Sequence, residues 1–218
     1  MTRRFDLLVF DWDGTLMDST AVIAAALQAA CADLGLPVPS EERARHIIGL
    51  GLYDAMRHIL PNVPPSIYPQ IVERYGAHFR AREESAPLFA GAETALAALE
   101  DAGHLLAVAT GKSRRGLDRV LERTGLGKRF DATRCGEEAA SKPAPAMLLE
   151  LQSELGVSKE RTLMIGDTTH DLQMAQNAGV AALAVSFGAH PRDQLLALQP
   201  LACIDEPQAL WQWLSQNA

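Results

Sequence analysis

Five short runs rich in Leu, Val and Ile are spaced along the chain, and helical patterns separate most of them. Apolar runs of this length are typical of strands buried on both faces, and strands that alternate with helices build a parallel sheet. The predicted strands are 7–10, 105–109, a weaker one at 130–135, 162–165 and 181–185. The sequence therefore predicts an α/β fold in which helices cover both faces of a parallel sheet.

The stretch between the first and second predicted strands carries helical patterns instead of a strand. Asp18 or Ser19 is expected to cap the first helix and Gly35 to end it. The predicted helices are 19–34, 41–48, 53–60 and 66–84, and the segment 61–69 is a proline-rich loop by composition. Helix-forming and apolar residues are too dense there for a disordered linker. Residues 18–86 are therefore predicted to form a small helical domain, inserted into an α/β domain made of 1–17 and 87–218.

Charge and composition exclude several classes of function. The chain has 20 basic and 27 acidic residues, a net charge of −7, which argues against nucleic acid or an anionic membrane as the main partner. Its three cysteines include no CxxC pair, so neither a disulfide framework nor a zinc site is indicated. No apolar run is long enough for a signal peptide or a membrane span. We therefore expect a cytoplasmic protein.

Two carboxylates follow the first predicted strand. Ligands bind beyond the carboxyl ends of the strands in a parallel sheet, so polar residues at these positions decide the function. Asp11 and Asp13 are two residues apart, which points their side chains the same way in an extended chain, and Gly14 permits a turn after them. Paired carboxylates suit acid–base chemistry or Mg²⁺ binding. The alternative is a polar strand end followed by a turn.

Groups that can bind an anion occur at the end of the second predicted strand and in a later loop. The second predicted strand ends near Thr110 and Gly111, and a helix follows from about Ser113. A hydroxyl and free backbone N–H groups at a helix N-terminus bind phosphate, although Thr110 or Ser113 could serve only as the helix cap. Lys142 precedes Pro143 in a loop that could direct its ammonium at an anion. A lone lysine in a loop is, however, more often solvated.

The fourth predicted strand is followed by Asp167 and Asp171. Oxygen donors gathered without cysteine favour Mg²⁺ over zinc. His170 lies between them and is either a ligand or, in keeping with the oxygen donors around it, a supporting or surface residue.

These motifs occur along the chain in the order Asp11-x-Asp13-Gly-Thr, Thr110, Lys142 and Gly-Asp167-x-x-x-Asp171. In this combination the sequence resembles the haloacid dehalogenase-like (HAD) hydrolase superfamily. The segments 89–92, 109–112 and 171–179 resemble the superfamily's phosphoglycolate phosphatase-like subgroup. The resemblance covers essentially the whole chain. It implies a Rossmann-like core, with the helical insertion placed where that subgroup carries its cap.

The resemblance implies a phosphatase that hydrolyses a small phosphorylated metabolite, such as phosphoglycolate, through an aspartyl phosphate. Asp11 would be the nucleophile, and Asp13 the general acid and then the general base. Thr110, the backbone N–H of Gly111 and Lys142 would bind the phosphoryl oxygens.

The resemblance also implies a metal site and a substrate loop. Mg²⁺ would be bound by the carboxylates of Asp11 and Asp167 and by the backbone carbonyl of Asp13, with Asp171 supporting them. The segment 48–52 resembles the glycine-bearing substrate loop of related caps, which makes Arg45, Gly49 and Gly51 candidates for substrate contact. Gly49 could equally be a helix end and a turn between helices.

Other activities of such proteins fit the residues less well. Dehalogenases lack the acid at the Asp13 position and need no metal, and phosphonate-cleaving relatives need a cap lysine, whereas no lysine precedes Lys112 here. Sugar-phosphate mutases keep both aspartates and stay an alternative, although hydrolysis is favoured. A receiver-type switch phosphorylated on Asp is an alternative of another class, but such domains have no helical insertion.

Overall fold

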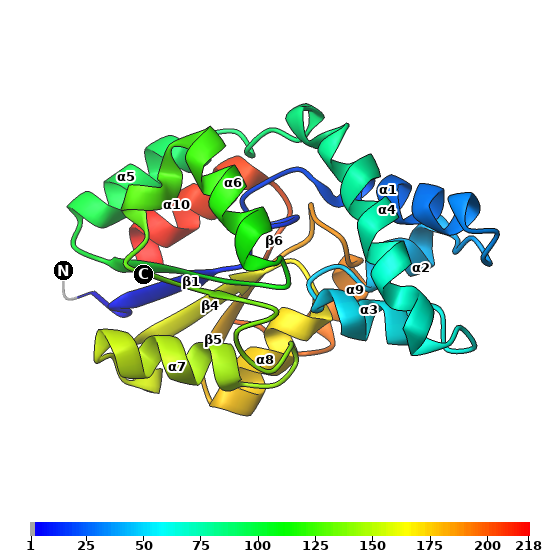
Figure 1. The fold of residues 1–218 in the computed structure, drawn as a ribbon. Coiled ribbons are helices and arrows are strands. Elements are labelled where there is room, and N and C mark those ends of the chain that lie inside the picture. The colour runs from blue at the N-terminus through cyan, green and yellow to red at the C-terminus, as the bar shows by residue number, and fades with distance from the viewer. Residues whose placement is uncertain (1–2) are drawn as a thin grey trace.

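A parallel six-stranded sheet with the strand order β3-β2-β1-β4-β5-β6 forms the centre of the structure, a computed structural model that describes residues 3–218 (Figure 1). The strands are β1 (Leu7–Phe10), β2 (Leu105–Thr110), β3 (Ala132–Cys135), β4 (Thr162–Gly166), β5 (Ala181–Val185) and β6 (Cys203–Ile204). The five predicted strands are confirmed, with small shifts at their ends. The edge strand β6 was not predicted, because two residues are too few for a hydrophobic pattern.

Helices cover both faces of the sheet because successive strand residues point to opposite sides. Leu8 and Phe10 pack towards α5 (Ala92–Asp101), α6 (Arg114–Thr124) and α10 (Pro207–Asn217). Leu7 and Val9 pack on the other side, against α7 (Ala146–Leu155) and α8 (Thr169–Ala178), and the short α9 (Arg192–Leu196) lies beside β5. These four β1 side chains are fully buried, which explains why the strand is a continuous apolar run.

A group of helices lies beyond one end of the sheet (Figure 1). It consists of α1 (Thr20–Asp33), α2 (Glu41–His46), α3 (Leu52–Ile59), α4 (Tyr68–Arg80) and the 3₁₀ turns Pro65–Ile67 and Glu83–Ser85. We call residues 20–85 the helical insert. It has an apolar cluster of its own, in which Leu27, Cys31, Met56 and Ile71 are buried. The helical insert is thus held together by internal packing as well as by contact with the core.

Two details of the insert differ from the sequence prediction. The segment 61–69 is not all loop, because it contains the Pro65–Ile67 turn and the start of α4. Pro69 is accommodated in the first turn of α4, where no backbone N–H is needed for the helix. The helix expected at 41–48 ends at His46, and the residues after it form a turn.

The chain enters and leaves the insert through two adjacent segments. The backbone N–H of Asp18 donates to the carbonyl of Pro87 at 2.9 Å, and Met17 forms an antiparallel bridge with Leu88. The two ends of the described part of the chain lie at the opposite side of the molecule (Figure 1). Within residues 3–218, none of the helices has the length and apolar character needed to cross a membrane.

Candidate active site

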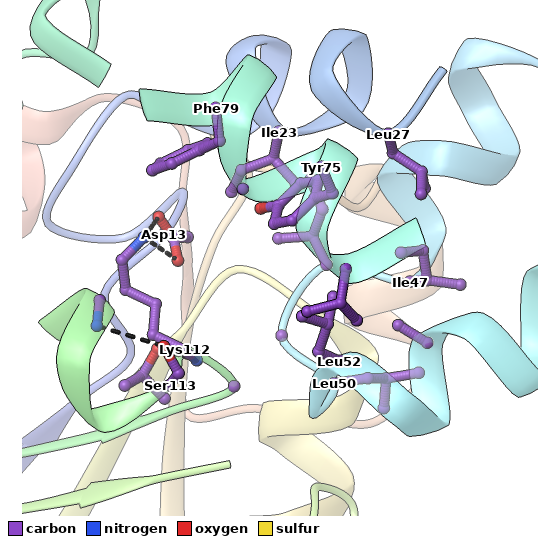
Figure 2. Close-up of a pocket in the computed structure, with 18 of the residues that line it drawn as sticks. Asp13, Ile23, Leu27, Ile47, Leu50, Leu52, Tyr75, Phe79, Lys112 and Ser113 are labelled. Atoms are coloured by element: carbon purple, nitrogen blue, oxygen red, sulfur yellow. Dashed lines mark hydrogen bonds and ion pairs between the residues drawn. The ribbon is translucent and has the colours of Figure 1, made fainter. Parts of the chain in front are cut away.

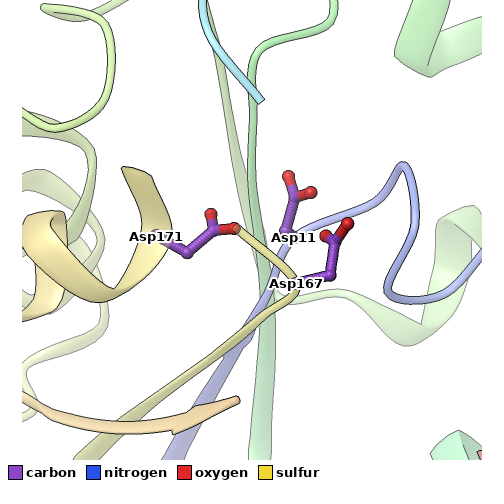
Figure 3. Close-up of side chains that lie close together, drawn as sticks. All are labelled: Asp11, Asp167 and Asp171. Carbon is purple, nitrogen blue, oxygen red and sulfur yellow. The ribbon is translucent and has the colours of Figure 1, made fainter. Parts of the chain in front are cut away.

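Three aspartates meet at the carboxyl end of the sheet (Figure 3). Asp11 directly follows β1, Asp167 directly follows the neighbouring strand β4, and Asp171 lies in the first turn of α8. All three are fully buried, and one carboxylate oxygen of each lies within 4.8 Å of the others. Parallel pairing of β1 with β4 is what brings Asp11 and Asp167 together, although they are far apart in the sequence.

Lys142 lies among these carboxylates and is buried. Its Nζ is 2.7 Å from Oδ1 of Asp11 and 2.6 Å from Oδ1 of Asp171. The general expectation that a loop lysine is solvated is therefore wrong for Lys142. Burial lowers the pKa of Lys142, but the two carboxylates raise it by more, so the pKa is raised overall and the ammonium stays charged.

The aspartate cluster carries more negative charge than Lys142 balances. Burial, together with the charge of Asp171, raises the pKa of Asp11 to about 7 against the opposing effect of Lys142. Burial and the charge of Asp11 also raise the pKa of Asp167 well above its usual value. Carboxylates that are so costly to ionise when buried are stabilised by a bound cation.

The hydrogen bonds of the three carboxylates indicate which oxygens are available to a metal ion. Oδ2 of Asp11 is buried and has no hydrogen-bond partner among the described residues. Asp167 accepts bonds from the hydroxyl of Thr15 and the backbone N–H of Ala189, one on each oxygen. Asp171 accepts from Lys142 on Oδ1 and from the backbone and hydroxyl of Thr168 on Oδ2. The oxygen-only donor set and the partnerless oxygen of Asp11 fit a hard divalent cation, with Asp171 the least available of the three.

Glycines leave room for Asp167. Gly14 has a φ of +86°, and a Cβ there would lie 2.2 Å from Oδ2 of Asp167. A Cβ at Gly188, in the loop after β5, would lie 2.2 Å from the same oxygen. The turn after Asp13 and the loop after β5 thus enclose this carboxylate so closely that neither position has space for a side chain.

Asp13 lies beside the aspartate cluster and is held by two side chains. Nζ of Lys112 is 2.8 Å from Oδ1 and 2.9 Å from Oδ2 of Asp13, and the hydroxyl of Ser19 donates to Oδ1 at 2.6 Å. Ser19 precedes α1, as predicted, but its side chain makes no capping bond because it binds Asp13 instead. Lys112 also lies 4.8 Å from the ring centroid of Phe79 in α4, so it contacts both Asp13 and the insert.

Thr110 ends β2 and is buried. Its hydroxyl accepts the backbone N–H of Lys112 at 3.2 Å, while Ser113 caps α6 by accepting the N–H of Gly116. Of the two possible caps for this helix, Ser113 is therefore the one used. Thr110 and Gly111 line a cavity together with Asp11 and Asp13.

This cavity, of about 230 Å³, lies between the carboxyl end of the sheet and the helical insert (Figure 2). Gly49 and Leu50 line it, and they contact the core so closely that a Cβ at Gly111 would lie 2.3 Å from the carbonyl oxygen of Leu50. Gly51 is next to the cavity, where its N–H donates to the hydroxyl of Ser141 at 2.7 Å. The loop 49–51 is thus packed directly against the core.

Arg45 and His170 lie away from this cavity. The guanidinium of Arg45 binds Glu41 at 3.0 Å and Thr20 at 3.1 Å, and Arg45 lines a second cavity beside His46 and His190. Nε2 of His170 donates to the backbone carbonyl of His46 at 2.9 Å. Of the two roles considered for His170, the supporting role fits this contact, because its ring faces the insert.

The sequence pattern of the haloacid dehalogenase-like hydrolase family matches residues 8–185. The chain belongs to this family. The match includes all the motif residues that the sequence analysis singled out, and it confirms the resemblance.

Relatives within the haloacid dehalogenase-like family match nearly the full chain. A protein of Dickeya dadantii named "Probable phosphatase IndB" is 40% identical over 204 residues, which are 91% of this chain and 89% of that protein. The phosphoglycolate phosphatase of Agrobacterium fabrum is 32% identical, covering 94% of this chain and 90% of that protein. The N-acetylmuramic acid 6-phosphate phosphatase of Pseudomonas aeruginosa is also 32% identical, covering 95% and 93%.

Solved structures share the fold. A hydrolase from Pseudomonas syringae superposes with a TM-score of 0.89 at 20% identity, covering 97% of this chain and 98% of that one. A haloacid dehalogenase-like family hydrolase from Streptococcus pneumoniae gives a TM-score of 0.81 at 23% identity, covering 96% and 98%.

Two residues of this HAD-family site were missed by sequence reasoning. Lys112 follows β2 in Thr-Gly-Lys, and a charged residue beyond a strand end was a signal that could have identified it. The role of Ser19 was hidden, because a serine before a helix is ordinarily a cap.

Proposed function

We propose that this chain is a Mg²⁺-dependent phosphatase that hydrolyses a small phosphate monoester through an aspartyl phosphate on Asp11. The observation that carries the proposal is the environment of Asp11. Its carboxylate is buried at the end of β1, with one oxygen bound by Lys142 and the other without a hydrogen-bond partner in residues 3–218. Membership of a hydrolase family, and full-length relatives named as phosphatases, support this class of reaction.

The proposal includes the division of the chain into a core, 1–17 and 87–218, and a cap, 18–86. It also includes the metal ligands: the carboxylates of Asp11 and Asp167 and the backbone carbonyl of Asp13, with Asp171 behind them. Bound Mg²⁺ supplies positive charge that offsets the repulsion between an anionic nucleophile and an anionic phosphate. The clustered, oxygen-only carboxylates support this assignment.

The chain's own residues then carry out two displacements. Asp11 attacks phosphorus, the bond to the ester oxygen breaks, and Asp13 gives that oxygen its proton. Asp13 then takes a proton from the water that attacks the acyl phosphate, which releases inorganic phosphate and restores Asp11. Thr110, the N–H of Gly111 and Lys142 hold the phosphoryl oxygens in both steps.

The substrate belongs to the small phosphorylated metabolites. Two relatives at 32% identity are named for different substrates, phosphoglycolate and N-acetylmuramic acid 6-phosphate. What those names share is a phosphate monoester, and that is the substrate class proposed for this chain.

The test separates Asp11 from Asp13 with p-nitrophenyl phosphate, whose leaving group needs little protonation. Asp13→Asn should release about one equivalent of nitrophenol and then stall, because hydrolysis of the acyl phosphate still needs the base, an effect of roughly 10²–10⁴-fold. The stalled protein should be heavier by about 80 Da, the mass of one HPO₃ group, in intact-protein mass spectrometry after acid quench. Asp11→Asn should form no adduct.

The adduct on Asp13→Asn should be cleaved by hydroxylamine, as acyl phosphates are. An adduct on Asp11→Asn, or none on Asp13→Asn, would show that the nucleophile and the acid–base residue are assigned wrongly.

A further inference from the structure

The wall that the helical insert contributes to the cavity is almost entirely apolar (Figure 2). The insert contributes apolar or small residues to this wall, including Leu27, Leu52, Val72, Tyr75 and Phe79, together with Arg80. Within the part of the chain that the structure describes, Arg80 is the one charged residue among them, and it is exposed. The opposite end of the same cavity holds the polar residues Asp11, Asp13 and Thr110.

Val72 shows that the apolar wall is not formed only by residues that also pack in the insert's own core. It lines the cavity, yet among the described residues it belongs to none of the buried apolar clusters. Tyr75 faces the cavity as well, and Figure 2 shows its hydroxyl on the side where Asp13 lies. An apolar side chain that packs mainly towards a cavity loses contact with water only when something apolar fills that cavity.

The basic residues that line the cavity, Arg80, Lys112, Arg115 and Arg119, are poorly placed for a second anionic group on the substrate. Lys112 is already bound to both oxygens of Asp13, and Nε of Arg119 is 3.0 Å from Glu83. Arg80 and Arg115 are exposed at the rim, where water weakens an ion pair. An unpaired carboxylate against the apolar wall would be strongly unfavourable.

We infer that the leaving group of the substrate carries an apolar body, aliphatic or aromatic, which occupies the space between Val72, Tyr75 and Leu52. This inference rests on the proposed phosphatase function and narrows its substrate class. Each methylene buried against the wall contributes about 0.8 kcal/mol, which corresponds to roughly a fourfold gain in kcat/KM.

The experiment is a series of linear alkyl phosphates from methyl to hexyl, compared with phosphoglycolate. The alcohols leave with nearly the same acidity, so differences in kcat/KM report contact with the leaving group. We expect kcat/KM to rise by roughly fourfold per methylene until the cavity is filled. Phosphoglycolate should be hydrolysed no faster than ethyl phosphate, which has the same carbon count without the carboxylate.

A matched pair of variants ties the effect to the wall. Val72→Asn places an amide in the cavity, whereas Val38→Asn makes the same change at a residue that is 54% exposed in the insert. The ratio of kcat/KM for hexyl over ethyl phosphate should fall at least fivefold in Val72→Asn and stay unchanged in Val38→Asn. Thermal unfolding of both variants checks that the insert is still folded.

A second measurement does not depend on turnover. The affinity of methyl, butyl and hexyl phosphonic acids, measured by calorimetry, should increase in the same order.

The contrary outcomes separate this inference from the proposed function. If p-nitrophenyl phosphate is hydrolysed but the alkyl series is flat, or phosphoglycolate is preferred, the inference is overturned and the phosphatase function stands. If none of the esters is hydrolysed, the proposed function fails and the inference fails with it.

Discussion

At the scale of single residues, the site depends on buried side chains of opposite charge that are paired with one another. Lys142 and Asp171 have fully buried side chains, and Lys142 also binds Asp11. A buried ion pair contributes modestly to stability as a whole, but removal of one partner leaves an uncompensated charge in a medium that solvates it poorly.

Lys142→Met should therefore lower the free energy of unfolding by about 3–5 kcal/mol and abolish turnover. Urea denaturation in EDTA measures the loss without a contribution from bound metal. Lys159→Met is the matched control, because Lys159 is exposed, and it should change stability little. Addition of Asp171→Asn to Lys142→Met should restore part of the stability but none of the activity. Equal stability of the wild type and Lys142→Met would contradict the importance of this ion pair.

Gly188 offers a residue-scale test of the metal site. Gly188→Ala places a Cβ 2.2 Å from Oδ2 of Asp167. The carboxylate of Asp167 therefore has to move. The Mg²⁺ concentration for half-maximal activity should rise at least tenfold, and activity lost in EDTA should return only at high Mg²⁺. Gly127→Ala, whose Cβ would have an ordinary 3.6 Å contact with Leu121, should leave the Mg²⁺ dependence unchanged. An unchanged dependence in both variants would argue that Asp167 is not a metal ligand.

The residues of the site were predictable from the sequence where they follow a strand. Asp11, Thr110 and Asp167 each end or follow a buried apolar run. A parallel sheet brings such positions together at the carboxyl ends of its strands. The bond from Lys112 to Asp13 was not predictable, because it joins side chains 99 residues apart whose meeting depends on two loops. The orientation of Arg45 away from the cavity was likewise not predictable from the sequence, since a hydrophobic pattern does not set the direction of a long polar side chain.

At the scale of the elements, the strands of the core were predictable and the details of the insert less so. Buried strands are continuous apolar runs, and this signal is strong over four or more residues. The edge strand β6 and the 3₁₀ turn Pro65–Ile67 are too short to carry such a pattern. Prolines mark both the end of a helix and its first turn, which is why the predicted loop 61–69 and the predicted helix 66–84 overlap at the start of α4.

His104 gives a prediction at this scale, because it ties the residue before β2 to Phe5, two residues before the start of β1. It is buried, and its Nδ1 is 3.0 Å from the carbonyl oxygen of Phe5. Burial, more than any other cause, lowers its pKa in the folded protein. The unfolded chain therefore takes up a proton more readily, and this group's contribution to stability is lost as the pH falls below about 6.5.

Urea denaturation at pH 7 and pH 5 measures the effect. The wild type should lose more stability over this interval than His104→Asn, whose amide keeps a donor for Phe5 but does not titrate. His58→Asn, at an exposed position, should behave like the wild type. An equal loss in all three proteins would mean that His104 is not responsible.

At the scale of the whole molecule, the insert is closed over the core. Gly51 binds Ser141, and the carbonyl of Leu50 lies against Gly111. A substrate of the kind proposed has to pass this contact, so the insert is expected to move away from the core in each turnover.

A reversible cross-link tests this motion. A Cβ at Gly51 would lie 3.4 Å from Cβ of Ser141, about the separation that a disulfide requires. Gly51→Cys with Ser141→Cys should lose at least tenfold in p-nitrophenyl phosphate hydrolysis on oxidation and recover with a reductant. Each single variant should be insensitive to the oxidant. Full activity in the cross-linked protein would show that substrate enters without separation of this contact.

The paired segments through which the chain enters and leaves the insert have an evolutionary consequence. Because Asp18 and Pro87 are hydrogen-bonded neighbours, the insert can be lengthened, shortened or replaced without pulling β1 away from the rest of the sheet. Recombination at this point would alter the cavity wall and leave the aspartates at the strand ends in place. A single ancestral catalyst could in this way give descendants that act on different substrates.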